Sequence, residues 1–298
     1  MTTTLLAAPL VIPESLRRNI AYFRGDAADA WLADALDLAQ RLADSWHVAP
    51  ETILEGGAMS LCMLCRLEDG SAAVLKIPES RGAGTAESSA LQMWSKSAPD
   101  VLATDQRSGA FLMEFITATG TQPNEEDIAG LLDRLHVPTT PRLHPLDDVL
   151  QARIGAAAAR FTGLAPETGA LQDAAAVIAA LQRTAQPTTV HGDFQAKNVI
   201  HTATGALAID PLPAAGDPYS DLGLWIGTGS GGPRSAAIWH YSEAAADPRR
   251  LLAWAWALTV LEFRHGRGRR DAREFIEGNR HIAADFGARD SPVRALAA

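Results

Sequence analysis

One stretch of the sequence holds polar residues at a spacing that suits metal-assisted chemistry. Two short apolar segments, Val199–His201 and Ala206–Ile209, flank a turn-forming sequence, which predicts a β-hairpin. If the hairpin is centred on Thr204, Asn198 lies opposite Asp210, with their Cα atoms about 5 Å apart. An amide oxygen and a carboxylate at that separation suit Mg²⁺, which usually completes its shell with waters and substrate phosphates. The alternative is a surface hairpin whose polar residues only cap the strand ends.

Asp193 lies on the loop that enters this hairpin, directly after His191 and Gly192. Its carboxylate can reach the edge of the predicted metal site without serving as a metal ligand. A carboxylate in such a position can accept a hydrogen bond from a hydroxyl group and align that group for reaction. The convergence of Asp193, Asn198 and Asp210 therefore favours a catalytic site over strand-end capping.

A charged pair is predicted upstream. Lys76 shares a strand face with Val74, and on its own it fits an ordinary lysine of an edge strand. Glu87, however, falls on the apolar stripe of the following predicted helix, together with Leu91 and Trp94. A carboxylate directed inward must be paired or it costs several kcal/mol, and Lys76 is the nearest candidate partner. Such a pair can hold the ammonium against nucleotide phosphates, although a purely structural pair is the alternative.

The predicted secondary structure divides the chain into two parts. A helical stripe from Glu14 to Trp46 comes first. The predicted strands lie at Leu61–Leu67, Ala72–Ile77 and Phe111–Ile116. The predicted helices lie at Thr85–Trp94, Ile128–His136, Leu146–Phe161, Leu171–Ala185 and Leu251–Phe263. We therefore expect an α+β fold of two lobes with a cleft between them, β-rich over residues 1–115 and mainly helical over residues 116–298.

The composition excludes several classes of protein. The 298 residues are 47% hydrophobic and 20% charged, which is too apolar for intrinsic disorder and too polar for a membrane protein. A formal net charge of −9 disfavours a nucleic-acid partner, because proteins that bind phosphate backbones usually carry the opposite balance. No apolar run is long enough to span a bilayer, and residues 1–12 lack the basic start of a signal peptide. We expect a cytoplasmic protein without membrane association.

The two cysteines, Cys62 and Cys65, are spaced as in redox and zinc motifs, but the chain holds no second pair. Both fall in the predicted strand 61–67, where residues three positions apart face opposite sides of the sheet. We therefore expect them to be small strand residues of a protein from a reducing compartment.

An ordered set of motifs in this sequence resembles the aminoglycoside phosphotransferase family, which has a protein-kinase-like fold. The set comprises the Lys76–Glu87 pair, Leu-Asp-Arg-Leu-His at 132–136, His-Gly-Asp-x-x-x-x-Asn at 191–198, Ala-Ile-Asp-Pro at 208–211 and Gly-Asp-Pro-x-x-Asp-Leu at 216–222. Together these motifs are specific for a small-molecule kinase. The branch of streptomycin 6-phosphotransferases and hydroxyurea phosphotransferases is the most similar, on the 208–211 motif and on Val-Ile-Pro-Glu-Ser-Leu at 11–16.

The resemblance implies a kinase that transfers the γ-phosphoryl group of ATP to a hydroxyl of an aminoglycoside, with GTP left open as the donor. Asp193 would orient and deprotonate the acceptor hydroxyl, and Asn198 and Asp210 would hold Mg²⁺. Lys76, paired with Glu87, would bind the nucleotide phosphates. The expected acceptor is streptomycin at its 6-hydroxyl, and its phosphorylation would confer resistance by inactivating the antibiotic.

Further roles follow from the same resemblance. Gly57 and Ser60 would lie in the loop that touches the phosphates, and the backbone from Glu114 to Ile116 would meet the adenine as a hinge. His191 would support the catalytic loop and Asp221 would brace it. Alternatively, Asp221 only favours the positive N-terminal end of the helix that follows.

The acceptor site is expected to be acidic, because aminoglycosides are cationic. The candidate substrate contacts are Asp193, Gln195 and Glu262, with Asp247 as a further carboxylate; the family commonly has His where this chain has Gln195. Alternatively, Glu262 and Asp247 are solvated charges at the ends of a helix. The basic run Arg264–Arg270 argues against a lobe that binds only cations.

Several alternatives stay open at this point. One alternative is that the acceptor is hydroxyurea or another small hydroxylated metabolite. Another is that the chain is a catalytically inactive kinase-like module that only binds nucleotide. A protein kinase is disfavoured because the chain has no His-Arg-Asp, Asp-Phe-Gly or Ala-Pro-Glu element. The glycine motif at 227–232 follows a helix instead of a strand, so a loop bordering the substrate cleft is expected there. We expect a monomer, with a dimer as the alternative.

Overall fold

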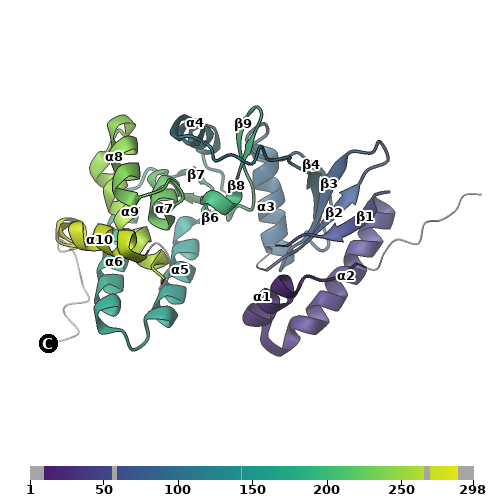
Figure 1. Cartoon of the computed structure of the whole chain (residues 1–298), viewed down its shortest axis with the longest axis horizontal. Helices are drawn as coiled ribbons and strands as arrows, with labels where there is room; N and C mark the ends of the chain where they lie inside the picture. The colour runs from purple at the N-terminus through teal and green to yellow at the C-terminus, as the bar shows by residue number, and fades with distance from the viewer. Residues whose placement is uncertain (1–9, 56–58, 142, 265–268, 288–298) are drawn as a thin grey trace, which may run out of the picture. The chain divides into compact units, whose positions relative to one another are not determined.

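The computed structural model describes residues 10–55, 59–141, 143–264 and 269–287. The chain divides into two compact units, Met1–Thr117 and Ala118–Ala298, whose elements are labelled in Figure 1. Within the described residues, the first unit holds a five-stranded sheet with helices, and the second unit is mainly helical. The expected α+β fold, with a β-rich part followed by a helical part, is confirmed.

The sheet of the first unit is antiparallel throughout, in the order β1-β2-β3-β5-β4. Its strands are β1 (Ala49–Ile53), β2 (Leu61–Arg66), β3 (Ala72–Ile77), β4 (Val101–Thr104) and β5 (Phe111–Glu114). Leu61 and Cys65 of β2 are buried in the same core as Leu75 and Ile77 of β3. Because side chains alternate along a strand, Lys76 lies on the opposite face of the sheet from its two neighbours.

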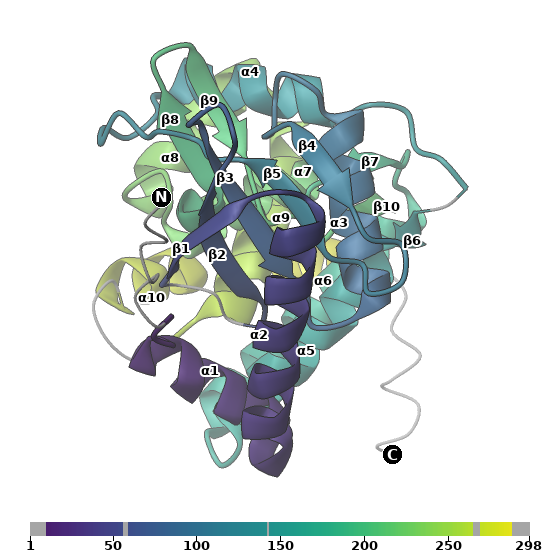
Figure 2. The ribbon, with the colours of Figure 1, turned by 90° about the vertical axis from the view of Figure 1, so that its right-hand side faces the viewer.

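Two helices, α1 (Glu14–Arg24) and α2 (Ala28–Ser45), pack against the core face of this sheet, and Figure 2 shows α2 running along it. The helical stripe expected from Glu14 to Trp46 is interrupted by Gly25, which adopts a φ of +54° that most residues avoid. The single stripe of the sequence therefore becomes two helices that contribute to one core.

Helix α3 (Arg81–Met93) begins before the predicted start at Thr85. The reason is a capping residue: the side chain of Ser80 accepts a hydrogen bond from the backbone N–H of Ala83 at 3.3 Å. Glu87 and Leu91 lie on the buried side of this helix, as the stripe in the sequence predicts. The helix thus directs one carboxylate toward the interior.

The second unit consists of helices and two small sheets, β6-β10-β7 and β8-β9. Its helices are α4 (Glu125–Leu135), α5 (Leu146–Phe161), α6 (Ala165–Arg183), α7 (Tyr219–Thr228), α8 (Arg234–Ala244), α9 (Pro248–Glu262) and α10 (Arg269–Gly278). Its strands are β6 (His144–Pro145), β7 (Thr188–Val190), β8 (Val199–Thr202), β9 (Gly205–Ala208) and β10 (Ala214–Gly216). The bounds of α5 are those predicted, and α7 is the helix expected around Asp221 and ahead of the glycine motif, whereas α8 and α10 are not among the predicted helices.

Helix α9 is the central helix of the second unit and is buried nearly all round. Helix α7 crosses it at glycine positions: a Cβ at Gly223 would lie 2.7 Å from the Cβ of Trp254, and one at Gly227 would lie 2.9 Å from the backbone nitrogen of Thr259. These glycines therefore permit close contact between the two backbones. Gly227 belongs to the glycine motif of the sequence, so this part of the motif serves helix packing.

The two cysteines occupy β2 and form no disulfide. Cys65 is buried and Cys62 is only half-buried, as expected for residues that face opposite sides of a strand. Burial raises the pKa of the Cys65 thiol to about 11, which makes it unreactive at neutral pH. Among the described helices, none combines the length and the apolar character that a membrane span requires.

Candidate active site

The predicted hairpin is present as β8 and β9, but its register differs from the expected one. Thr202 pairs with Gly205, so the reversal contains two residues instead of being centred on one. Asn198 consequently lies opposite Ile209, whose backbone N–H donates to the Asn198 carbonyl at 2.9 Å. The expectation that Asn198 faces Asp210 across the ladder is therefore wrong, since a shift of one residue moves a side chain to the other face.

Asp210 instead follows the ladder with an unusual backbone. Its φ of +57° lies in the left-handed region, which aspartate tolerates better than most residues. The next residue is Pro211, and proline disfavours helical conformations in the residue before it. A strained conformation of this kind persists only where the surroundings hold it, and such positions cluster at functional sites. The chain therefore redirects the Asp210 side chain just after the hairpin ends.

The loop between β7 and β8 contains His191, Gly192 and Asp193, and it is fixed from two directions. A Cβ at Gly192 would lie 2.2 Å from the carbonyl oxygen of Leu212, and the φ of Gly192 is +76°. Leu212 in turn donates its backbone N–H to the carbonyl of His191 at 2.9 Å. Only glycine fits this close approach, so the backbone requires the glycine of the His-Gly-Asp sequence.

Asp221, in the first turn of α7, holds the same loop. Its carboxylate accepts hydrogen bonds from the backbone N–H groups of His191 at 2.7 Å and Gly192 at 2.9 Å. A third contact of 3.1 Å joins it to Nε2 of His136. Burial alone would raise the pKa of Asp221, but the contacts with His136 and the loop outweigh burial and lower it. The carboxylate is thus ionised and bound to the loop at neutral pH.

His191 is fully buried at the centre of this arrangement. Its Nε2 lies 3.0 Å from the carbonyl oxygen of Ile209, and its Nδ1 accepts the backbone N–H of Asp193 at 3.2 Å. These contacts require the neutral ring with its proton on Nε2. Burial lowers the pKa of His191, although the charges of Asp221, Asp193 and Asp210 act in the opposite direction.

We expect mild acid to destabilise the second unit through His191. Because its pKa is lowered on folding, the unfolded chain binds a proton more readily below the ordinary value of 6.5, so stability falls as the pH drops through that value. The melting temperature should decrease between about pH 7.5 and 5.5, and His191→Gln should decrease less over the same range. Calorimetry of both proteins checks this, and equal slopes would contradict it.

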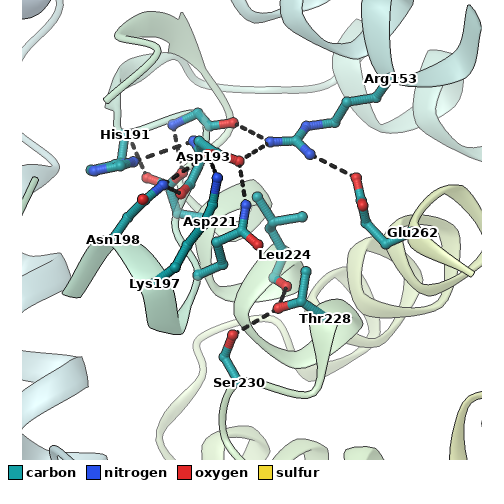
Figure 3. Close-up of polar contacts among 12 residues, drawn as sticks. Arg153, His191, Asp193, Lys197, Asn198, Asp221, Leu224, Thr228, Ser230 and Glu262 are labelled. Atoms are coloured by element: carbon teal, nitrogen blue, oxygen red, sulfur yellow. Dashed lines mark hydrogen bonds and ion pairs between the residues drawn. The ribbon is translucent and has the colours of Figure 1, made fainter. Parts of the chain in front are cut away.

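Asp193 accepts hydrogen bonds on both carboxylate oxygens, as Figure 3 shows. Oδ1 accepts from Arg153 at 2.5 Å and from Gln195 at 2.6 Å. Oδ2 accepts from the Asn198 amide at 2.8 Å, and the ammonium of Lys197 lies 3.3 Å away. The Asp193 side chain is only 12% exposed. Its orientation is therefore fixed by four neighbouring donors, whereas the sequence indicated only that it lay beside the hairpin.

The residues predicted to hold a cation have the donor chemistry for one. Asn198 is buried, and its amide nitrogen donates both to the backbone carbonyl and to the carboxylate of Asp193. This orientation commits the nitrogen and presents the amide oxygen as the ligating atom. With the exposed carboxylate of Asp210, it supplies hard oxygen ligands that suit Mg²⁺ and leave room for waters and phosphates. Among the described residues, no group of three or more His, Cys, Asp or Glu side chains forms a larger metal cluster.

Lys76 and Glu87 form the predicted pair in the first unit. Nζ of Lys76 lies 2.6 Å from Oε1 of Glu87, and the two side chains are 5% and 9% exposed. The pair joins β3 to α3. A buried pair of this kind fixes the ammonium in place, which is what a phosphate-binding lysine requires.

The other nucleotide-site residues inferred from the resemblance lie in the first unit. Ser60 is half-buried immediately before β2, and Gly57 lies outside the described residues. Glu114 ends β5, where its backbone N–H donates to Asp100 at 2.9 Å. Ile116 follows outside regular secondary structure, shortly before the end of the unit.

A pocket of about 920 Å³ in the second unit contains Asp193, Gln195 and Glu262 on its wall. This volume is typical of a site for a drug-sized ligand. Glu262 is only 17% exposed and pairs with Arg153, so its interpretation as a solvated helix end is wrong. Asp247 instead caps α9, accepting the backbone N–H of Arg250 at 3.0 Å.

The pocket is not acidic, contrary to the expectation from the sequence. Among its described lining residues, cationic side chains outnumber anionic ones. The cations are Arg153, Arg160, Lys197, Arg234, Arg264 and Arg269, and the anions are Asp193, Glu262 and Asp271. Residues 265–268 of the basic run lie outside the described residues. Gly229 and Gly232 also line the pocket, so the end of the glycine motif borders it, as expected.

Arg153, which joins Asp193 to Glu262, is not among the site residues predicted from the sequence. A signal for it exists in α5, whose buried residues are Leu146, Leu150, Ala157 and Phe161. Arg153 falls on that same helical stripe, three positions after Leu150 and four before Ala157. The rule that identified Glu87, that a charge on an apolar stripe must have a partner, applies equally to Arg153.

The fold is shared with solved kinases. A choline/ethanolamine kinase family protein from Mesorhizobium loti matches with a TM-score of 0.55 at 18% identity, over 87% of this chain and 96% of that protein. The amicoumacin kinase hAmiN, solved with AMP-PNP, Ca²⁺ and Ami, matches with a TM-score of 0.52 at 14% identity, over 90% of this chain and 99% of that protein. The architecture is therefore that of the kinases with a protein-kinase-like fold.

Sequence comparison identifies the family of this chain among the kinases with a protein-kinase-like fold. Residues 45–224 match the aminoglycoside/hydroxyurea antibiotic resistance kinases, and the chain belongs to that family. Streptomycin 6-kinase of Streptomyces griseus is 29% identical over 270 residues, 87% of this chain and 85% of that protein. Streptomycin 6-kinase of Streptomyces glaucescens is 32% identical over 223 residues, 71% of this chain and 73% of that protein. The expected family is confirmed, and the chain is a phosphotransferase that acts on a hydroxyl group.

Proposed function

We propose that this chain uses ATP and Mg²⁺ to phosphorylate the 6-hydroxyl of a streptomycin-type aminoglycoside and thereby inactivates it. The observation that carries this proposal is the fixed carboxylate of Asp193 on the wall of a pocket large enough for a drug-sized ligand. The names of the two Streptomyces relatives support streptomycin as the acceptor. The nucleotide analogue and divalent cation bound to the amicoumacin kinase support a nucleotide–metal donor.

In this mechanism Asp193 accepts a hydrogen bond from the acceptor hydroxyl and aligns its oxygen with the γ-phosphorus. As the new O–P bond forms, the bond between the γ-phosphorus and ADP breaks, and Asp193 takes up the hydroxyl proton. The transition state of phosphoryl transfer is loose, so little basicity is needed and orientation contributes most. The four donors around Asp193 supply that orientation. Lys76 would bind the nucleotide phosphates, held in place by Glu87. Asn198 and Asp210 would hold the cation, which when bound offsets phosphate charge.

We place this reaction in the cytoplasm of the cell that expresses this chain, where nucleoside triphosphates are abundant. Cys62 and Cys65 form no disulfide, which fits a reducing compartment. The net charge of −9 supports a small-molecule substrate over a nucleic acid.

A second candidate acceptor is hydroxyurea or another small hydroxylated compound without positive charge. The cationic majority among the described lining residues favours it, because a polycation meets repulsion in such a pocket. The family description names hydroxyurea beside the aminoglycosides.

Mass spectrometry of a panel of acceptors distinguishes these candidates. The purified chain is incubated with Mg²⁺ and either ATP or GTP, together with streptomycin, other aminoglycosides or hydroxyurea. We expect streptomycin to gain one phosphoryl group and tandem fragmentation to place it on the 6-hydroxyl. Phosphorylation of hydroxyurea alone would select the second candidate. Loss of nucleotide phosphate without any modified acceptor would count against both.

A further inference from the structure

Arg153 of α5 joins two carboxylates in the pocket wall. Its Nη2 donates to Oδ1 of Asp193 at 2.5 Å and to the carbonyl of Gly192 at 3.0 Å, while its Nη1 donates to Oε1 of Glu262 at 2.7 Å. Figure 3 shows the guanidinium between the two acidic side chains. The side chains of Arg153 and Glu262 are 14% and 17% exposed. The guanidinium is therefore held from three sides.

The charge of Arg153 is permanent. Burial would lower its pKa, but the carboxylates of Asp193 and Glu262 outweigh burial and raise it. A planar guanidinium fixes the direction of each carboxylate that it contacts, because its N–H groups point in set directions. Lys197, the other cation at Asp193, has a side chain that is 58% exposed and contacts the opposite oxygen. Arg153 is therefore a rigid cation at Asp193, whereas Lys197 is a solvated one.

We propose that Arg153 is a positioning residue for phosphoryl transfer, and that Glu262 anchors Arg153 instead of binding a cationic group of the acceptor. This inference rests on the proposed function, both for the role of Asp193 and for the choice of acceptor. The two carboxylates near the acceptor are already balanced by the charges of Arg153 and Lys197, so an amine of the substrate gains little there. Acceptor recognition then depends on the rest of the pocket.

The test is to remove the Arg153 guanidinium by mutation and then to add guanidinium ion to the solution. Arg153→Ala should lower kcat about 100-fold, because displacing a reacting group by about 1 Å costs that much. The KM for ATP should stay within about twofold, because Arg153 acts on Asp193 and not on the nucleotide. Guanidinium at about 50 mM is far too dilute to unfold the chain. At this concentration it should raise the kcat of Arg153→Ala at least about tenfold above its value without guanidinium. Urea and methylammonium, which lack the charged planar fork, should restore less.

A matched control is Arg250→Ala. Arg250 forms a comparable buried pair with Asp217 at 2.6 Å in the same unit, outside the pocket. This variant should lose melting temperature but keep its kcat, with or without guanidinium. Glu262→Gln, which retains one oxygen to accept from Arg153, should lower kcat only several-fold and leave acceptor KM nearly unchanged.

A second readout needs no acceptor. Guanidinium should raise the melting temperature of Arg153→Ala by mass action, since it binds the folded site, but should not raise that of the native chain. If the native chain modifies no acceptor in the panel, the proposed function fails while this readout still tests the contact. The proposal is overturned if Arg153→Ala keeps kcat within about threefold of the native value. It is equally overturned if guanidinium restores the melting temperature but not kcat, or if Glu262→Gln mainly raises acceptor KM.

Discussion

Replacing Asp193 with asparagine should reduce kcat by about 1,000-fold or more, the range expected when a positioned acid–base group is lost. Asparagine keeps the shape of the side chain but replaces one carboxylate oxygen with a donor. Whichever way the amide turns, its nitrogen faces donors, either Arg153 and Gln195 or Asn198 and Lys197. The variant therefore loses the charge that attracts the hydroxyl proton and the fixed orientation of this side chain.

Nucleotide binding should survive this change, because Lys76 and Glu87 lie in the other unit. Isothermal titration with a non-hydrolysable nucleotide measures that affinity, and quenched-flow assays measure kcat. Asp173→Asn is the matched control, since Asp173 is an exposed carboxylate of α6. Substantial phosphorylation by Asp193→Asn would exclude the proposed role of this residue.

Replacing Asp221 with alanine should cost about 4 kcal/mol of folding free energy, because it leaves two buried backbone N–H groups without their acceptor. For a unit of this size, such a loss lowers the melting temperature by about 8–16 °C. Catalysis should fall as well, since both N–H groups belong to the loop that carries Asp193. Calorimetry and steady-state kinetics on the same preparation measure the two effects.

His136→Ala is the control for this second prediction. It removes the third contact of Asp221 but leaves both backbone hydrogen bonds in place, so its effect should be much smaller. Asp221→Asn should fall between the two alanine variants, because its single amide oxygen can accept from one N–H group. If Asp221→Ala melts at the temperature of the native chain, the loop does not depend on this carboxylate.

Local patterns in the sequence account for much of this structure. Helix α5 has its predicted bounds because its apolar residues recur at helical spacing over its whole length. The Lys76–Glu87 contact follows from one charge on an apolar stripe and one lysine on the adjoining strand. Both depend on residues that are close in sequence or in neighbouring elements, where spacing alone determines which side chains meet.

The register of the hairpin and the partners of Asp193 depend on more than spacing. A turn of two residues and a turn centred on Thr204 suit the same sequence, yet they differ by one position in every cross-strand pair. The contact of Arg153 with Asp193 joins α5 to a loop far along the chain, and α5 alone does not specify its partner. The charge of the pocket could not be predicted from local spacing for the same reason, since its basic side chains come from several elements.

The left-handed backbone of Asp210 has a consequence for selection in the laboratory. Glycine adopts that conformation without strain, so Asp210→Gly should relieve the backbone while deleting a carboxylate that we assign to cation binding. A library screened only for heat resistance would enrich glycine at this position and discard the enzyme's turnover. A library screened for survival on antibiotic would retain aspartate. Selection for thermal stability and selection for drug resistance would therefore favour different residues at position 210.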